Sequence, residues 1–351
     1  MKNVKNILFK MEMNGHGVVN YDSNDQKYVL KDTHLRNVGG HSNVSYAKKN
    51  LYKDDEGKIT YKLKISSDAL KNNMFRHDVI AQTPNIAHHD ALLYSYIASP
   101  LSLVRGYLFA NKPETVKRKG AITLSSAEQT CNAMSKIEVF SRSGEKVVQN
   151  EDSDKNDTTY YQKETIGNIK YEAMGNIDLM TLQFISCDSV FDRYSFNPDK
   201  YHLYKQFLAQ KLSGFNSELG YHQMKNTSIE IPEYGVLLSE ENVVQLVKDS
   251  LKKVFNINIK KKDAFATVET LKVKLVEKPA EDTFNNEDGW IEIKSEEDID
   301  NLDFDPYMFY ELIDIEVAKI KRQEIKDEMK RVLDEEKKQK KSKTSKKKKD
   351  E

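Results

Sequence analysis

The sequence predicts an α+β fold, because strand-like and helix-like patterns of apolar residues alternate along it. Residues 7–13 and 271–275 are apolar at every second position, which is typical of strands with one buried face. Residues 243–255 place apolar side chains at helical spacing, shortly after Ser239, a residue type that caps helices. A strand, a helix and a second strand in this order are compatible with an α+β core or an α/β core. Of these two classes we expect α+β.

Further elements are expected between these regions. Residues 60–65 alternate again as a strand, and Ser66-Ser67-Asp68 can cap a helix that runs toward residue 77. Residues 90–107 are apolar apart from Ser99-Pro100, so we expect a second helical turn to begin at the proline. A basic loop is expected over 112–120, and residues 125–128 have the form of a helix capping box.

The stretch 158–193 has the densest pattern in the chain. Residues 158–171 indicate a strand, a turn and a second strand, and Gly175-Asn176 indicates a further turn. Residues 177–187 are almost continuously apolar, which suits a strand buried on both faces. A short buried helix fits that run almost as well, so both alternatives stay open.

Composition limits the class of protein. The chain has 351 residues, 38% of them hydrophobic, which is enough for one large domain or two smaller ones. It has no apolar run near the ~20 residues that cross a bilayer, and its start does not resemble a signal peptide. Two cysteines, Cys131 and Cys187, are too few for a disulfide framework or a thiolate zinc site. We therefore expect a cytoplasmic protein with no membrane partner and two buried, inert thiols.

Charge is unevenly distributed, although the formal net charge is zero. Residues 1–125 hold about 19 Lys and Arg against about 11 Asp and Glu, an excess that favours contact with a polyanion. An ordinary solvated surface is the alternative. Residues 281–316 hold about 14 acids and a single lysine, whereas the end of the chain from Lys337 is mostly lysine.

These patterns divide the chain into three parts. Residues 1–280 form the main folded part, and 281–336 comprise the acidic segment and a charged helix, which recurring apolar residues predict over 311–336. Residues 337–351 are expected to be a disordered, lysine-rich tail. One hypothesis for the acidic segment is that it packs on a basic patch of a neighbouring copy.

Two runs of histidine and aspartate are the candidates for catalysis. Arg76-His77-Asp78 and His88-His89-Asp90 offer imidazole and carboxylate ligands, so a metal-dependent nuclease or phosphohydrolase is one alternative. Such a site needs further ligands at matching positions, and helix-end or surface histidines are the simpler interpretation. The sequence has no phosphate-binding loop, dinucleotide fingerprint or nucleophile elbow. We therefore expect that the protein is not an enzyme and that it binds neither a metal ion nor a cofactor.

Clustered cations indicate nucleic-acid binding instead. Lys117-Arg118-Lys119 places three positive charges together, and Arg105 stands beside Gly106, where the backbone can approach a phosphate closely. Tyr171 follows Lys170 and Lys163, and aromatic residues interleaved with cations suit single-stranded nucleic acid. The alternative is that the tyrosines are ordinary strand residues that fill a sheet face.

Four segments of the chain together form a recognisable series. They occur in this order: Asn14-Gly15-His16-Gly17-Val18-Val19-Asn20, Met74-Phe75-Arg76-His77, Leu103-Val104-Arg105-Gly106-Tyr107 and the region 163–193. In these segments the chain resembles the Cas-seven family, the repeating backbone subunit of the type I CRISPR surveillance complexes called Cascade, and within it the minimal type I-F variant group most closely. His77 is followed by Asp78 rather than by a second histidine, and residues beyond about 281 have no counterpart in this resemblance.

The resemblance implies a fold, a function and a set of partners. The fold would be an RRM-like (ferredoxin-like) palm with inserted finger and thumb-like elements. Copies would form a helical filament on a crRNA, hold it for pairing with target DNA in antiviral defence, and join other Cascade subunits and a recruited helicase-nuclease. No catalytic residue is implied, because cleavage would belong to that recruited enzyme.

The residues expected to contact RNA are the clustered cations and the polar residues of the quoted motifs. A buried pair with Asp192 is an equal alternative for Arg193. The full expected set is His16, Asn20, Arg76, His77, Arg105, Lys117, Arg118, Lys119, Lys163, Tyr171 and Arg193.

Overall fold

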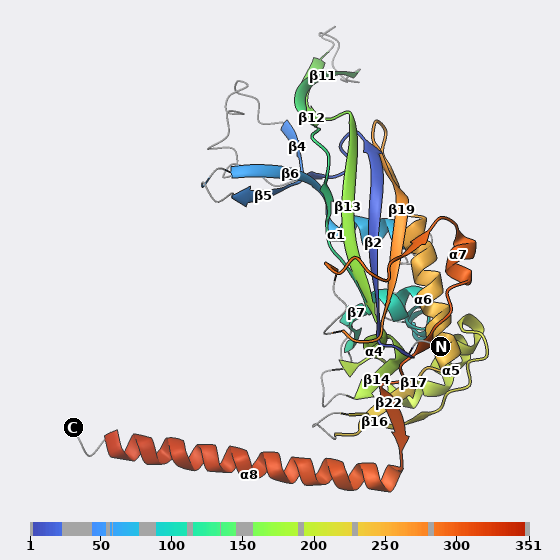
Figure 1. Ribbon diagram of the computed structural model, residues 1–351. Coiled ribbons are helices and arrows are strands. Elements are labelled where there is room, and N and C mark those ends of the chain that lie inside the picture. The colour runs from blue at the N-terminus through green and yellow to red at the C-terminus, as the bar shows by residue number, and fades with distance from the viewer. Residues whose placement is uncertain are drawn as a thin grey trace, which may run out of the picture.

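The structure is a computed structural model that describes residues 3–22, 44–53, 57, 59–76, 89–110, 115–133, 135–144, 157–188, 193–226, 231–279 and 284–347. Within these residues the protein has a mixed α and β architecture with largely antiparallel sheets (Figure 1), as the sequence predicts. No helix in the described part of the chain is long and apolar enough to cross a membrane.

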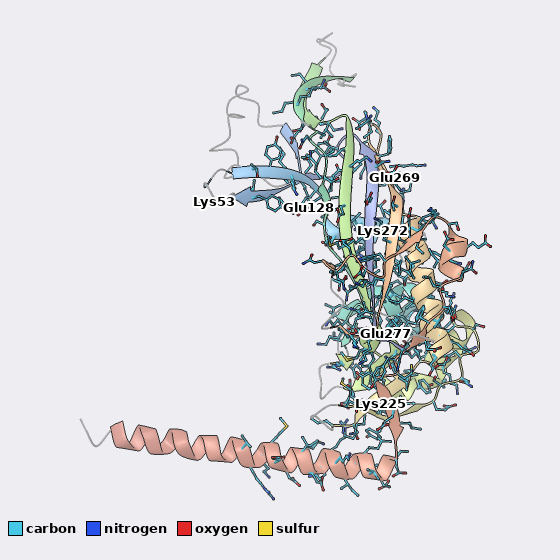
Figure 2. All side chains as sticks on the ribbon, in the orientation of Figure 1. Lys53, Glu128, Lys225, Glu269, Lys272 and Glu277 are labelled. Carbon is cyan, nitrogen blue, oxygen red and sulfur yellow. The ribbon has the colours of Figure 1, made fainter. Side chains whose placement is uncertain are left out.

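Three long strands form the centre of the main sheet. β2 (Asn6–His16) lies between β13 (Asn168–Asp178) and β19 (Phe265–Val276) and pairs antiparallel with both. The expected alternation in β2 is confirmed, because the apolar side chains at 7, 9, 11 and 13 are all buried. Glu269 and Lys272 lie along β19, and Glu277 follows its end (Figure 2).

Shorter strands complete this 9-stranded sheet, in the order β18-β19-β2-β13-β10-β6-β5, with β9 on β13 and β20 on β19. The two strands at the β5 edge project to one side of the sheet (Figure 1). The bounds are β5 (Lys49–Lys53), β6 (Ile59–Ile65), β9 (Ile122–Leu124), β10 (Ala127–Gln129), β18 (Asn258–Lys260) and β20 (Ile291–Ile293).

Two further sheets lie at opposite ends of the central strands (Figure 1). A 4-stranded sheet continues beyond one end of β13, with β11 (Lys136–Gly144), β12 (Asp157–Thr165), β4 (Val44–Ala47) and β3 (Tyr21–Asp22). A 5-stranded sheet lies at the other end, with β15 (Arg193–Tyr194), β14 (Phe184–Asp188), β17 (Glu233–Leu237), β16 (Leu219–Met224) and β22 (Tyr310–Ile313). The pairs β7 (Tyr107–Ala110) with β8 (Thr115–Arg118) and β1 (Asn3–Val4) with β21 (Asp305–Pro306) stand apart.

The helices begin where the sequence predicts. Ser66 accepts a hydrogen bond from the backbone of α1 (Ser67–Met74), and Ser239 does the same for α6 (Glu240–Phe255). α2 (Asp90–Ile97) ends before Ser99, and α3 (Pro100–Arg105) starts on the proline. Each cap satisfies a backbone N–H that has no partner inside the helix. The remaining short helices are α4 (Leu179–Gln183), α5 (Tyr201–Lys211), α7 (Glu296–Asp300) and a 3₁₀ turn, Pro198–Lys200.

The structure corrects several local expectations. Gly175-Asn176 is not a turn but lies inside β13, where a Cβ on Gly175 would collide with the ring of Phe9. The apolar run 177–187 contains both a short helix and a buried strand, the two alternatives that its sequence leaves open. It includes the end of β13, the helix α4 and most of the fully buried strand β14. Part of the expected basic loop is strand β8, and the expected capping box at 125–128 overlaps strand β10. Local residue patterns do not contain the partner strands that decide these cases.

The acidic segment belongs to the folded body. Three strands within 281–316 pair with strands from elsewhere in the chain: β20 with β19, β21 with β1, and β22 with β16. The last helix, α8 (Ile315–Lys347), projects away from the body (Figure 1) and continues into the part that the sequence predicts to be disordered. Residues 315–347 contain neither glycine nor proline and are rich in Lys, Glu and Gln, which are good helix formers.

Candidate nucleic-acid interface

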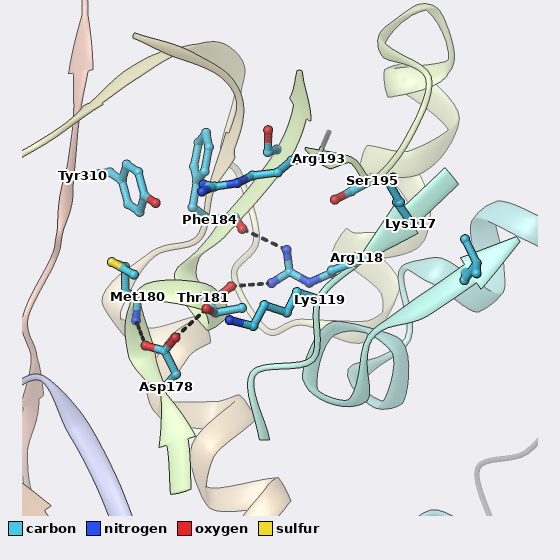
Figure 3. Close-up of a pocket in the computed structure, with 12 residues that line it drawn as sticks. Lys117, Arg118, Lys119, Asp178, Met180, Thr181, Phe184, Arg193, Ser195 and Tyr310 are labelled. Carbon is cyan, nitrogen blue, oxygen red and sulfur yellow. Dashed lines mark hydrogen bonds between the residues drawn. The ribbon is translucent and has the colours of Figure 1, made fainter. Parts of the chain in front are cut away.

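A cationic cavity lies where the β7–β8 hairpin meets α4 and the 5-stranded sheet. Its volume is about 550 Å³, and Lys117, Lys119 and Arg193 lie in its wall (Figure 3). Lys117 lies within β8 and Lys119 directly follows the last residue of this strand, whereas Arg193 begins β15. The fold therefore brings together expected RNA-contacting residues from distant parts of the sequence.

Local backbone geometry sets the position of the hairpin. Gly106 ends α3 with φ +80°, a conformation that favours glycine, and a Cβ there would collide with backbone atoms of Arg118 and Gly120. The next residue, Tyr107, donates a hydrogen bond through its hydroxyl group to the carbonyl oxygen of Ser195 at 2.7 Å. The sequence Arg105-Gly106-Tyr107 thus fixes the hairpin beside the residues that follow β15.

Arg118 is a structural brace, which corrects its expected role as a phosphate contact. Its guanidinium donates hydrogen bonds to four backbone carbonyls, at 2.8 to 3.2 Å, and its side chain is buried. Burial lowers the pKa of Arg118 below its ordinary value. Two of the carbonyls belong to α4, whose last carbonyls lack partners within the helix and favour a cation. The four acceptors are Leu103, Phe184, Thr181 and Leu182.

The side chain of Arg193 is more than half exposed to solvent. Its side chain is 56% exposed, and one guanidinium nitrogen lies 3.2 Å from a carboxylate oxygen of Glu233. Burial raises the pKa of Glu233, while Ser186 and Arg193 act to lower it. The expected alternative partner, Asp192, lies outside the described residues. Arg193 therefore has the accessibility and the charge to bind a further anion at the cavity mouth.

Aromatic rings complete this cavity. Phe184 and Tyr310 both line it, and their rings stack with centroids 4.5 Å apart. Asp178, which also lines the cavity, accepts a hydrogen bond from the backbone N–H of Met180 at 3.1 Å as the cap of α4. The two rings are buried and form the floor on which the cationic side chains stand, and Lys117, Lys119 and Arg193 give the cavity the charge to bind phosphate.

A second group of expected residues lies at the other end of the central strands. The ammonium of Lys163 is 2.8 Å from a carboxylate oxygen of Asp263 and 4.9 Å from the ring centroid of Tyr21. His16 stacks on Phe265 with centroids 6.2 Å apart, and its Nδ1 lies 2.9 Å from the side-chain oxygen of Asn168. His16, Tyr21 and Asp263 line a cavity of about 360 Å³.

Other expected residues surround α1. The side-chain amide of Asn20 donates to the hydroxyl oxygen of Ser66, the cap of α1, at 3.1 Å. Arg105 donates to the side-chain oxygen of Asn72 at 2.7 Å. Arg76 is exposed just after the helix and lines a cavity of about 680 Å³. His77 lies outside the described residues.

Tyr171 is a core residue, which corrects its expected role in base stacking. Its side chain is buried on the helix-covered face of the main sheet, against Gly15 of the neighbouring strand. Burial raises the pKa of its hydroxyl group. At this position, therefore, the tyrosine is an ordinary strand residue that fills a sheet face, which is the alternative to RNA stacking.

The structure does not assemble the alternative metal site from the residues it describes. His77, Asp78 and His88 lie outside them. His89 precedes α2 without a side-chain capping bond, and Asp90 pairs with Lys200 at 2.8 Å. Among the described residues no group of three or more His, Cys, Asp or Glu side chains could hold a metal ion.

Sequence reasoning missed several residues of both cavities. Asp263 and Phe265 follow the run Lys260-Lys261-Lys262, and the register of β19 on β2 brings Phe265 opposite His16. Tyr310 comes from β22, far along the chain from Phe184. No local motif marks these positions, because pairing between distant strands creates the contacts.

Comparison with known proteins gives a family match. The model of a family described as "Type I-Fv CRISPR-associated protein Cas7fv-like" matches residues 3–310. No curated protein matches the sequence.

Three chains of solved structures show distant similarity. A "CRISPR RNA-guided surveillance complex" chain is 12% identical, with 76% of this chain and 68% of that chain covered and a TM-score of 0.36. A second such chain, in a "pre-nicking" state, is 8% identical, with coverages of 76% and 77% and a TM-score of 0.35. A chain of a "Type III-B Cmr-beta" complex bound to cognate target RNA is 9% identical, with coverages of 54% and 51% and a TM-score of 0.29.

Proposed function

The chain belongs to the Cas7fv-like family of type I-Fv CRISPR-associated proteins, and from this premise we propose that it is a crRNA-binding backbone subunit of a Cascade surveillance complex. The observation that carries the proposal is the family match over residues 3–310. The cationic cavity with Lys117, Lys119 and Arg193 supports it, because it offers positive charges for phosphate.

The strand order supports an RRM-like palm. In such a fold two strand–helix–strand units interlock, so that the first and third strands lie at the centre and all neighbouring strands are antiparallel. Here β19, β2, β13 and β9 lie side by side with every pair antiparallel. Helices α1 to α3 precede β9, and α6 precedes β19. The projecting strands β5 and β6 and the β11–β12 hairpin are the proposed finger and thumb-like elements (Figure 1).

The proposed assembly is a helical filament of copies on one guide RNA. Each copy holds the RNA backbone, so that its bases remain available for pairing with target DNA. Other Cascade subunits and a recruited helicase-nuclease are the further partners, and the complex acts in the cytoplasm in antiviral defence. On this proposal the subunit holds RNA and does not cleave it.

The test is the nucleic acid that copurifies with the full chain. The chain is expressed together with a CRISPR array, and the bound nucleic acid is extracted, sized and sequenced. A discrete RNA that contains spacer and repeat sequence is expected. Heterogeneous cellular RNA would instead indicate a general RNA-binding protein, and nucleic-acid-free protein would contradict the proposal. Cleavage of the RNA that stops with EDTA would favour the metal-dependent nuclease.

A further inference from the structure

Residues 284–290 cross one face of the central sheet (Figure 1), and we call them the strap. The segment that follows, β20, pairs with β19 at the sheet edge. Within the strap, Phe284 stacks on Trp290 with ring centroids 6.5 Å apart, and the indole N–H donates to the carbonyl oxygen of Asn286 at 2.9 Å. Gly289 has φ +79°, which lets the chain turn just before Trp290. The strap is thus a compact turn with an aromatic side chain at its end.

The strap contacts a group of lysines on the sheet. Lys10 of β2 and Lys272 of β19 face each other across the two strands, and Lys274 follows on the same face. The ammonium of Lys10 lies 3.1 Å from the Glu287 carboxylate and 4.7 Å from the ring centroid of Trp290. These contacts place a negative charge and an aromatic ring over one lysine.

Lys274 is covered more completely. It is 2% exposed, its ammonium donates to the carbonyl oxygen of Asn286 at 3.2 Å, and it lies 5.8 Å from the ring centroid of Trp290. A lysine is seldom so buried, because its charge loses solvation. The carbonyl and the ring compensate part of that loss.

The chemistry of these contacts is that of single-stranded nucleic acid on a sheet. Such strands bind when phosphates pair with lysines and bases stack beside them. Here Glu287 supplies the anion and Trp290 supplies the flat ring. Lys10, Lys272 and Glu287 also line a polar hollow of about 240 Å³, together with Glu12 and Glu172. Only with Glu287 in place do the carboxylates of this hollow outnumber its lysines, so the strap makes the hollow repel phosphate.

We propose that the strap is a built-in occupant of this sheet face that excludes single-stranded nucleic acid from it. RNA contacts are then confined to the cavities at the two ends of the central strands. The proposal does not depend on which RNA the protein carries, because it concerns only where an oligonucleotide can lie. It also gives part of the acidic segment a role within its own chain, rather than on a neighbouring copy.

The test loosens the strap in the full chain and maps where an oligonucleotide lies. The variants are Glu287→Gln, which changes a side chain that is 81% exposed and cannot disturb the core, and Trp290→Ala. A photoreactive oligouridine of about 20 nucleotides is cross-linked to each protein, and cross-linked peptides are identified by mass spectrometry. Acylation rates of Lys10, Lys272 and Lys274 are measured without nucleic acid.

We expect both variants, but not the wild type, to cross-link through peptides that contain Lys10 or Lys272. Acylation of Lys274 should become about fivefold faster in Trp290→Ala, because the ring that shields it is gone. Two controls should behave as wild type: Trp290→Phe, which keeps a ring, and Glu297→Gln, which removes an exposed charge on α7. The proposal is overturned if the wild type already cross-links through this face, or if neither variant does.

Discussion

Arg322 of α8 and Asp188 at the end of β14 form an ion pair that joins the last helix to the body of the protein. The two side chains are 17% and 4% exposed. Arg322 also donates to the carbonyl oxygen of Pro232 at 3.0 Å and lies 5.5 Å from the ring centroid of Tyr221. Since the family match ends at residue 310, this anchor holds a helix that lies outside the matched region.

Replacing Arg322 with alanine should therefore destabilise the protein. The change leaves the buried Asp188 carboxylate without its guanidinium partner, which should lower the free energy of unfolding by about 2–3 kcal/mol. Urea denaturation followed by circular dichroism measures the loss. Arg331→Ala removes the same charge at an exposed position of α8 and should change stability by less than about 0.5 kcal/mol. Equal effects of the two changes would show that the pair does not anchor the helix.

Arg118 should behave as a stability residue rather than as an RNA contact. Alanine at this position leaves four buried carbonyls without their donor, which should cost about 3–5 kcal/mol of unfolding free energy. Lysine keeps the charge but lacks the guanidinium fork, so Arg118→Lys should recover only part of the loss. Thermal unfolding gives the comparison. A stable Arg118→Ala protein with weakened RNA binding would restore the original expectation.

Lys119 should show the opposite behaviour. It is exposed beside the cationic cavity, so Lys119→Ala should leave unfolding unchanged and weaken guide-RNA binding by about fivefold near 0.1 M salt. The slope of log affinity against log salt should fall by about one, as expected for one lost phosphate contact. Fluorescence anisotropy over a salt series measures both quantities. Lys330→Ala, on the projecting helix, is the matched control.

The contrast between Arg118 and Lys119 shows what the sequence could and could not predict. The strands at 7–13, 60–65 and 271–275 and the capped helices could be predicted, because period and caps are local properties. The sequence also identifies 117–119 as a run of three cations. Strand β8 ends at Arg118, however, and the partners of the two neighbours come from elsewhere in the chain. Arg118 is buried against carbonyls of α3, α4 and β14, whereas Lys119 is exposed.

The rest of the site depends on long-range pairing. Tyr171 directly follows Lys170 in the sequence, but the pairing of β13 with β2 and β10 places its side chain in the core. The partner of Lys163 is Asp263, about a hundred residues later in the chain. The strap could not be anticipated either, because nothing near Trp290 in the sequence indicates that it reaches β2.

Glu233 should make stability depend on pH. Burial raises its folded-state pKa above the ordinary value, so folding favours the protonated acid. Its contribution is then fully present below the unfolded pKa and is lost as pH rises through the folded pKa. Glu233→Gln should therefore gain stability relative to wild type as pH rises from about 4 toward 7. Urea midpoints over this range measure the difference, and Glu241→Gln, at an exposed position, should show none.

The Lys163–Asp263 pair should limit RNA affinity at its end of the sheet. Asp263 neutralises the Lys163 ammonium at 2.8 Å, so Asp263→Asn should release that charge and tighten RNA binding by about three- to fivefold at low salt. If Lys163 carries the effect, Asp263→Asn should change nothing in a Lys163→Ala background, because no charge remains to be released. Anisotropy titrations of the wild type, both single variants and the double variant give this cycle. Equal gains in the two backgrounds would mean that Asp263 only repels RNA and that Lys163 does not bind it.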